Sequence, residues 1–328
     1  MVVGLDSMTN EPVWWAALAA LAQEQPQLQF WSQHPMPADF QKHMTSTAGQ
    51  VQVWLYGQLP QKRAQQPYVF LLAGHEVIFS SGAPAGLRRF WERRRLHTFL
   101  QQAGAITVPT PQHRQHLINE FNVPAQRLHL LNACIPPEQV LADEIKQQWG
   151  GTEAFAATGT DMITALKAFS AFKKRQQSGW KLIWLSDDVV KAQAVLTGYK
   201  YKDDVQVRPL ADGPSVLPAV YALVCTTPHL WWHSCIITAW QCGVPVIAQK
   251  NAAVTQQGPD AVHAVETGAP ESFAAGLMEL YKDEALHQRL SLAAQNTGRL
   301  WSAHKTVQDL KAVLAAAAPT FVAAKKES

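Results

Sequence analysis

The segment from Tyr221 to Lys250 constrains the fold more than any other part of the chain. It reads YALVCTTPHLWWHSCIITAWQCGVPVIAQK, and both ends contain short apolar runs typical of buried strands. Between these runs, apolar residues recur at helical spacing from His233 to Gln241. Gly243 can adopt the left-handed conformation that ends a helix, and Pro245 follows where a helix cannot continue. A helix between two buried strands predicts a βαβ crossover and therefore a parallel sheet.

The same alternation of short apolar strands and helices runs through the rest of the chain, which predicts an α/β protein with two domains. Strands are expected at residues 28–31, 51–56, 68–73, 105–108, 126–131, 154–158, 181–185, 205–207 and 261–265. Helices are expected at residues 14–22, 87–100, 113–121, 162–172, 191–197, 270–281, 285–300 and 306–318, with Asp161 capping the fourth. Pro136, Pro137 and the polar residues up to Gly151 predict a linker.

Composition excludes several classes of protein. The chain has 328 residues, of which 47% are hydrophobic and 16% charged, so it can form packed cores and is not disordered. A net charge of +3 is too small to indicate a nucleic-acid partner. No apolar run reaches the ~20 residues needed to span a bilayer, and the first residues lack the basic start of a signal peptide. A cytoplasmic protein is therefore expected.

The cysteines do not indicate a metal site. Cys134, Cys225, Cys235 and Cys242 lack C-x-x-C spacing and stand in apolar or helical contexts, so reduced thiols are expected. No metal and no cofactor are expected.

Residues Cys242–Ala248, CGVPVIA, resemble the CGTPVIA turn of retaining GT-B glycosyltransferases, which use nucleotide-sugar donors. Residues 107–132 resemble the crossing between the two domains of that family, residues 165–174 resemble its LLKAFSxFKK helix, and residues 281–284 resemble its C-terminal region. The resemblance implies two Rossmann-like domains facing a cleft. It implies an acceptor-side domain at residues 1–148, a donor-side domain at 149–302, and a C-terminal helix, 303–318, that packs back on the first domain.

The resemblance also shows where this sequence departs from the family. No strand is predicted before Trp14, so the N-terminal domain is expected to be shortened by loss of its usual first strand. Active members carry a Glu-x7-Glu motif in the second domain. Alignment on the Gly243 turn places Leu230 and Thr238 at these two positions, so both carboxylates are absent.

Two further donor-side features of the family are replaced. The glycine-rich loop before the helix is here Trp231, Trp232 and His233, and indoles do not allow the close backbone approach that glycine allows. The basic pair that binds the diphosphate is replaced by Thr160 and Asp161, and a carboxylate there repels a diphosphate.

The remaining candidates also rest on the resemblance. Asn132, Gly159 and Gly243 match donor-binding positions, in addition to the residues at the replaced positions. His75 follows the strand at 68–73 and matches the histidine that faces acceptor and donor in the family, so His75 and Thr238 are the catalytic candidates. Lys167, Lys173 and Lys174 are alternative phosphate contacts, or else part of a solvated helix face.

Three functions stay open at this point. The first is a divergent hexosyltransferase that moves sugar from a UDP- or GDP-linked donor to a glycan or lipid-linked acceptor in surface polysaccharide or glycoconjugate assembly. The second is an inactive partner or scaffold of the same fold, and the third is a carbohydrate-binding module that stacks sugars on Trp231 and Trp232. Residues 87–100 contain five arginines and one glutamate, which predicts either a solvated face or peripheral contact with anionic lipid at the inner membrane face.

Overall fold

The computed structural model describes residues 2–7, 12–25, 29–31, 51–55, 68–71, 87–108, 111–131, 142–227 and 233–317. The chain divides into two compact units, of which the first contains Met1–Cys134 with Ala303–Ser328 and the second contains Ile135–Ser302. Among the described helices, none combines the length and the apolar composition that crossing a bilayer requires.

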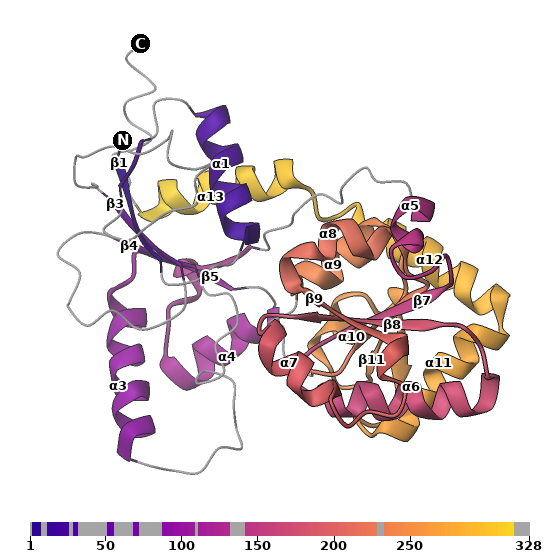
Figure 1. Ribbon diagram of the computed structural model, residues 1–328. Helices are drawn as coiled ribbons and strands as arrows, with labels where there is room; N and C mark the ends of the chain where they lie inside the picture. The colour runs from indigo at the N-terminus through magenta and orange to yellow at the C-terminus, as the bar shows by residue number, and fades with distance from the viewer. Residues whose placement is uncertain are drawn as a thin grey trace. The chain divides into compact units, whose positions relative to one another are not determined.

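The first unit is built on a parallel sheet of six strands (Figure 1). In sheet order these are β2 (Gln29–Trp31), β1 (Val2–Ser7), β3 (Val51–Leu55), β4 (Tyr68–Leu71), β5 (Ala105–Val108) and β6 (Leu128–Leu130). β5 is buried along its whole length, as expected for a strand covered by helices on both faces.

The first strand of this sheet corrects the sequence analysis. β1 pairs in parallel with β2 on one side and with β3 on the other, so it lies inside the sheet and is not missing. The run from Val2 to Ser7 is interrupted by Gly4 and Asp6, which hides the strand from a reading of apolar periodicity. Pairing with two neighbouring strands supplies what local propensity does not.

Four of the described helices cover this sheet, and the last of them comes from the C-terminal part of the chain. They are α1 (Pro12–Glu24), α3 (Leu87–Gln102), α4 (Pro111–Phe121) and α13 (Ala303–Ala317). Figure 1 shows α1 and α13 on one side of the sheet and α3 and α4 on the other. α13 contacts α1, β4 and β5, and the ammonium group of Lys311 forms an ion pair with Glu24.

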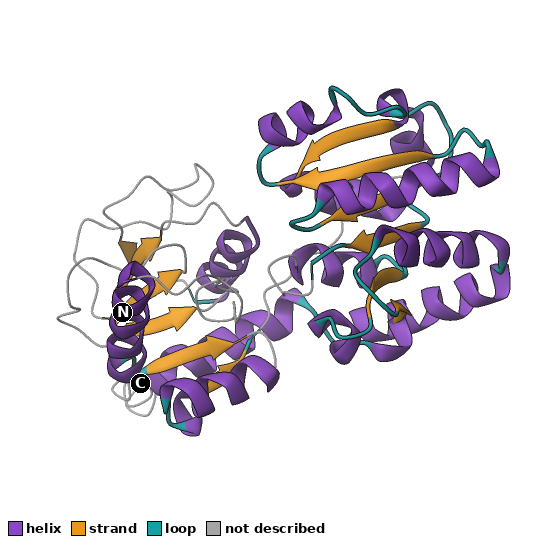
Figure 2. Cartoon of the chain, turned by 90° about the horizontal axis from the view of Figure 1, so that it is seen from below, coloured by secondary structure: helices purple, strands orange, loops and turns teal. Residues whose placement is uncertain are grey.

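The second unit contains another parallel sheet of six strands, covered by helices on both sides (Figure 2). In sheet order these are β12 (Val262–Val265), β11 (Val246–Gln249), β10 (Ala222–Cys225), β7 (Ala154–Thr158), β8 (Lys181–Ser186) and β9 (Val205–Pro209). The chain runs outward from β7 through β8 to β9, then returns to β10 and runs outward in the other direction. The order therefore reverses between β7 and β10, which is where ligands bind in open α/β sheets.

Each face of the second sheet has its own core. Alternate residues of β7 point to opposite faces, so Ala154 and Ala156 pack in one core and Phe155 and Ala157 in the other. The first core is closed by α5 (Ala142–Gln147), α8 (Gly213–Val216), α9 (His233–Gln241), α10 (Ala253–Gln257) and part of α12 (Glu284–Gly298). The second core is closed by α6 (Met162–Gln176), α7 (Val189–Leu196) and α11 (Pro270–Lys282).

Short 3-10 turns occur in both units. One lies at Ala125–Arg127 in the first unit, and the second unit has turns at Lys202–Asp204, Leu210–Asp212, Leu217–Ala219 and Pro259–Ala261.

The βαβ crossover predicted from the central segment is confirmed. β10, α9 and β11 follow one another, and β10 pairs in parallel with β11. Gly243 has φ of +73°, and a Cβ there would lie 2.8 Å from side-chain atoms of Gln295. Glycine is thus required both by the backbone conformation and by the space available.

The segment expected to be a linker contains structure of its own. α5 lies within it, and Ile145 and Trp149 are buried in the core of the second unit. Ile145 precedes the predicted boundary at 148–149 and Trp149 follows it, whereas the division into compact units falls after Cys134. The prolines that indicated a linker, Pro136 and Pro137, lie outside the described residues.

Candidate functional site

The candidate site is the edge of the second sheet where β7 and β10 end, here called the carboxyl edge. Gly159, Thr160 and Asp161 follow β7, and Thr226 and Thr227 follow β10. The two strand ends are tied together, because Thr226 donates to the carbonyl of Thr158 from its backbone nitrogen at 3.0 Å and from its hydroxyl at 3.3 Å. The chain order reverses at this place, so the position is the one expected for a ligand.

Gly159 allows these two strand ends to approach each other. It is buried, has φ of +131°, and a Cβ on it would lie 2.4 Å from the hydroxyl of Thr226. The same Cβ would lie 3.1 Å from the backbone nitrogens of Thr226 and Thr227. The absence of a side chain at Gly159 therefore lets the backbone of Thr226 and Thr227 pack close to it.

Asp161 occupies the N-terminal end of α6, as predicted. One carboxylate oxygen accepts a hydrogen bond from the Thr164 backbone nitrogen at 2.9 Å, and the other accepts one from the Thr164 hydroxyl at 2.7 Å. Thr160, beside it, is exposed. A helix N-terminus attracts anions through its unpaired backbone N–H groups and its dipole. Here the protein's own carboxylate already lies at that position.

The neighbouring helix is capped in the same way. Asp188 accepts a hydrogen bond from the Lys191 backbone nitrogen at 2.9 Å at the start of α7, and Asp187 beside it is exposed. The starts of α6 and α7 both follow central strands of the sheet, so carboxylates lie at two adjacent positions of the carboxyl edge. This arrangement disfavours a second negative charge there.

The lysines considered as phosphate contacts lie along α6. Lys167 and Lys174 are exposed, whereas Lys173 is buried. The Lys173 ammonium lies 2.9 Å from a carboxylate oxygen of Asp204 and donates to the carbonyls of Ser178 and Trp180. Lys173 is therefore part of the support of the unit and not a free cation for a ligand.

The candidates on and just after α9 lie at different positions along the helix. His233 is the first residue of α9, where the structure describes the backbone and not the side chain. Thr238 is 2% exposed, and its carbonyl accepts a hydrogen bond from the Cys242 nitrogen at 3.0 Å. Gly243 follows the C-terminal end of α9, so the helix separates it from Gly159 and Thr160.

Several candidates lie outside the described residues and stay predictions. These are His75, Asn132, Leu230, Trp231 and Trp232, and Cys134, expected to be a reduced thiol, lies outside the described residues as well. Among the predicted site residues that the structure describes, Gly159 and Thr160 lie at the carboxyl edge, and His233, Thr238 and Gly243 lie on or just after α9.

The thiols of Cys225, beside the site, and of Cys242, just after α9, are poor nucleophiles. Burial raises the pKa of Cys225 to about 11, although its sulfur also interacts with the Thr227 carbonyl. Burial likewise raises the pKa of Cys242 to about 12. Both groups are therefore protonated near neutral pH, and a thiol is a poor nucleophile.

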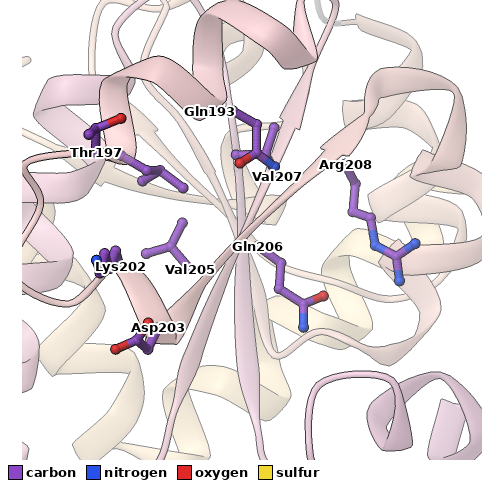
Figure 3. Close-up of a pocket in the computed structure, with 9 residues that line it drawn as sticks. Gln193, Thr197, Lys202, Asp203, Val205, Gln206, Val207 and Arg208 are labelled. Atoms are coloured by element: carbon purple, nitrogen blue, oxygen red, sulfur yellow. The ribbon is translucent and has the colours of Figure 1, made fainter.

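A second feature, which the sequence did not indicate, is a pocket of about 660 Å³ along the edge strand β9. Figure 3 shows Val205 and Val207 on one side of the strand and Gln206 and Arg208 on the other. Arg208 donates to the side-chain oxygen of Gln148 at 2.6 Å and therefore already has a partner. We assign no ligand to this pocket.

Comparisons with known proteins identify the fold. No protein-family model matches the sequence, and no curated protein matches it either. Among solved structures, the chain is similar to WaaG, a glycosyltransferase involved in lipopolysaccharide biosynthesis, with 13% identity, a TM-score of 0.71, and coverage of 95% of this chain and 98% of that one. It is similar to sucrose-phosphate synthase from Thermosynechococcus elongatus, with 13% identity, a TM-score of 0.71, and coverage of 98% and 100%.

A third similar structure is Anabaena HepE in complex with UDP-glucose, with 12% identity, a TM-score of 0.70, and coverage of 96% of this chain and 99% of that one. All three likenesses extend over nearly the whole chain. The protein therefore has the GT-B fold of two Rossmann-like units, as the sequence predicted.

Proposed function

We propose that this protein is a glycosyltransferase that transfers a hexosyl group from a nucleotide sugar to a glycan or lipid-linked acceptor, in surface polysaccharide or glycoconjugate assembly. The observation that supports it is the reversal of strand order between β7 and β10, with Gly159 and Thr160 at the carboxyl edge of a GT-B fold. UDP-linked sugars are the favoured donor class, since the HepE structure holds UDP-glucose. GDP-linked sugars remain the alternative.

The donor side of the proposed site is altered. A diphosphate bound at the start of α6 would meet the carboxylate of Asp161, which is already held by two hydrogen bonds from Thr164. The hydroxyl of Thr238 replaces a carboxylate that would anchor ribose, and the residue is buried. We therefore propose His75 as the main catalytic group and expect nucleotide-sugar affinity in the millimolar range, about 4 kcal/mol at the 1 M standard state.

A second candidate function is an inactive partner or scaffold of the same fold, or a carbohydrate-binding module. It is favoured by the two capping carboxylates, Asp161 and Asp188, at adjacent helix starts. The predicted loss of the first strand no longer supports it, since β1 is present.

Titration calorimetry with UDP, GDP and their hexose conjugates tests the donor proposal. Transfer is followed by nucleotide release on adding a lipid-linked glycan fraction. Millimolar binding with transfer supports the proposed function, and binding without transfer supports the inactive candidate. Micromolar binding to any of these nucleotides would contradict the altered donor site. Replacing His75 with Ala should abolish transfer without changing donor affinity.

Contact with a membrane surface is a further part of the proposal. On α3, Leu96, Phe99 and Leu100 are buried in the core of the first unit, whereas Arg94 and Arg95 are exposed. At these described positions the apolar side chains pack within the protein, so the contact that we propose with anionic lipid is electrostatic. Arg94→Glu with Arg95→Glu should reduce co-sedimentation with phosphatidylglycerol vesicles. Unchanged sedimentation, or equal binding to phosphatidylcholine vesicles, would refute this contact.

A further inference from the structure

The second unit has another cavity, at the opposite end of the sheet from the carboxyl edge. It has a volume of about 590 Å³ and lies where α9 and α12 end. Because helices between parallel strands end near the beginning of the next strand, this position is the amino edge of the sheet. We call this cavity the α9–α12 cavity. Its lining residues are Gln241, Gln295, Gly298, Arg299, Trp301 and Ser302.

The cavity combines one indole with several polar side chains. Trp301 is partly buried and packs against the core below, and it also lines the cavity. Gln295, Arg299 and Ser302 are exposed around it. Amides and hydroxyls can each donate and accept hydrogen bonds, as sugar hydroxyls do, and an indole offers an electron-rich face to the C–H groups of a sugar ring.

The backbone of Trp301 is tied to both neighbouring helices. The Gln241 side-chain nitrogen donates to the Trp301 carbonyl at 2.6 Å, which ties the end of α9 to the segment after α12. The Trp301 backbone nitrogen donates in turn to the Gly298 carbonyl at 3.0 Å. Because its backbone is held at both of these points and its side chain packs against the core, the segment that carries Trp301 is ordered before a ligand binds, which lowers the cost of binding.

Electrostatics distinguish this cavity from a phosphate site. The C-terminal ends of α9 and α12 both lie at it, and helix C-termini present partial negative charge. Among the lining residues, only Arg299 carries a charge. Two helix ends with one exposed guanidinium favour neutral groups that donate hydrogen bonds over a diphosphate. A nucleotide is therefore the wrong ligand class for this cavity.

We propose that the α9–α12 cavity is a second binding site that takes a neutral sugar ring, at the opposite edge of the second unit from the donor site. A volume of about 590 Å³ lies within the range of small-molecule sites, roughly 300–1,000 Å³. Only the source of the sugar depends on the proposed function, because that function would supply a growing glycan. A site of this kind would hold a glycan at a distance from the point of transfer.

The test uses the whole protein and neutral disaccharides: maltose, cellobiose and diacetylchitobiose. Binding is measured by saturation-transfer NMR and by amide and indole shifts. We expect millimolar binding to at least one of them that weakens about tenfold in Gln295→Ala with Arg299→Ala, since both side chains are exposed and the variant should fold. Trp301→Ala should abolish binding. Leu292→Ala is the matched control, because Leu292 is 61% exposed on α12 and does not line the cavity.

Competition separates this site from the donor site. UDP at saturating concentration should leave disaccharide binding unchanged, whereas displacement by UDP would place the sugar at the carboxyl edge and refute the inference. Failure of all three disaccharides to bind, or equal binding to the Gln295 and Arg299 variant, would also refute it. Disaccharide binding in a protein that binds no nucleotide would support this site while the proposed transfer reaction fails.

Discussion

Replacing Asp161 with asparagine changes the charge at the start of α6 and keeps the cap. The carboxylate accepts hydrogen bonds from the backbone nitrogen and hydroxyl of Thr164, at 2.9 and 2.7 Å. Asparagine is as good an N-cap as aspartate, and its side-chain oxygen can accept from the same backbone nitrogen. We therefore expect the unfolding free energy to change by less than about 1 kcal/mol.

The effect on a bound diphosphate can be worked out from Coulomb's law. Two unit charges 4 Å apart interact by about 1 kcal/mol in water and by about 4 kcal/mol at an effective dielectric constant near 20. Asp161 is exposed, which places the repulsion in the lower part of this range. Removing about 1–2 kcal/mol of repulsion should tighten nucleotide binding about five- to thirtyfold. The gain should shrink at high salt, where exposed charges are screened.

Calorimetry with UDP and UDP-glucose at two salt concentrations measures this gain. Asp283→Asn is the matched control, because Asp283 caps α12 by accepting from the Leu286 backbone nitrogen at 2.9 Å. α12 begins where α11 ends, at the amino edge, so this variant should leave nucleotide affinity unchanged. An Asp161→Asn protein that binds UDP no better than wild type, or an equal gain in Asp283→Asn, would show that α6 is not the diphosphate position.

Two further predictions concern the stability of the second unit. Gly298→Ala should lower the unfolding free energy by about 1–3 kcal/mol, because the new Cβ would lie 2.5 Å from a backbone nitrogen of α9. Gly198→Ala, with nothing within 4 Å of its Cβ, should be neutral in the same denaturant titration, and equal losses would contradict this account. For Asp204, burial acts to raise the pKa, but hydrogen bonds from two lysines outweigh it and lower the pKa. The ionised Asp204 carboxylate stabilises the folded protein fully above the unfolded pKa of 3.8, and this stabilisation is lost as pH falls through the lowered folded pKa. Asp204→Asn should therefore flatten the acid side of the stability profile, and an unchanged profile would argue against this ion pair.

Periodicity was sufficient to predict most of the second unit because its central strands, such as β7, β8 and β10, are short and apolar and are almost wholly buried. The βαβ crossover around α9 was predicted to the residue at both helix ends, since Gly243 and Pro245 mark the stop unambiguously. β1 was missed because its six residues include a glycine and an aspartate. Its strand conformation depends on β2 and β3, which are distant in sequence.

The site was harder to predict because, like β1, it depends on contacts between residues that are distant in sequence. Sequence patterns show which face of a helix is buried, and not which distant groups meet there. The pairing of Lys173 with Asp204 joins residues on α6 and before β9, and it removes a lysine that the sequence left available for phosphate. The link from Gln241 to Trp301, which shapes the α9–α12 cavity, likewise joins two segments sixty residues apart.

The start of α6 shows how the fold would tolerate the altered donor site that we propose. A helix N-terminus is stabilised by a side chain that accepts from its free N–H groups, by about 1 kcal/mol, and a nearby carboxylate is favoured by the dipole. A basic pair at the same place would forgo that cap and stand against the dipole, and only a bound anion would compensate. Asp161 therefore favours the folded protein in the absence of ligand and opposes the diphosphate with the same group. If donor binding is weak for this reason, a single neutral cap should strengthen it, whereas a cap combined with a new lysine should strengthen it further at some loss of stability.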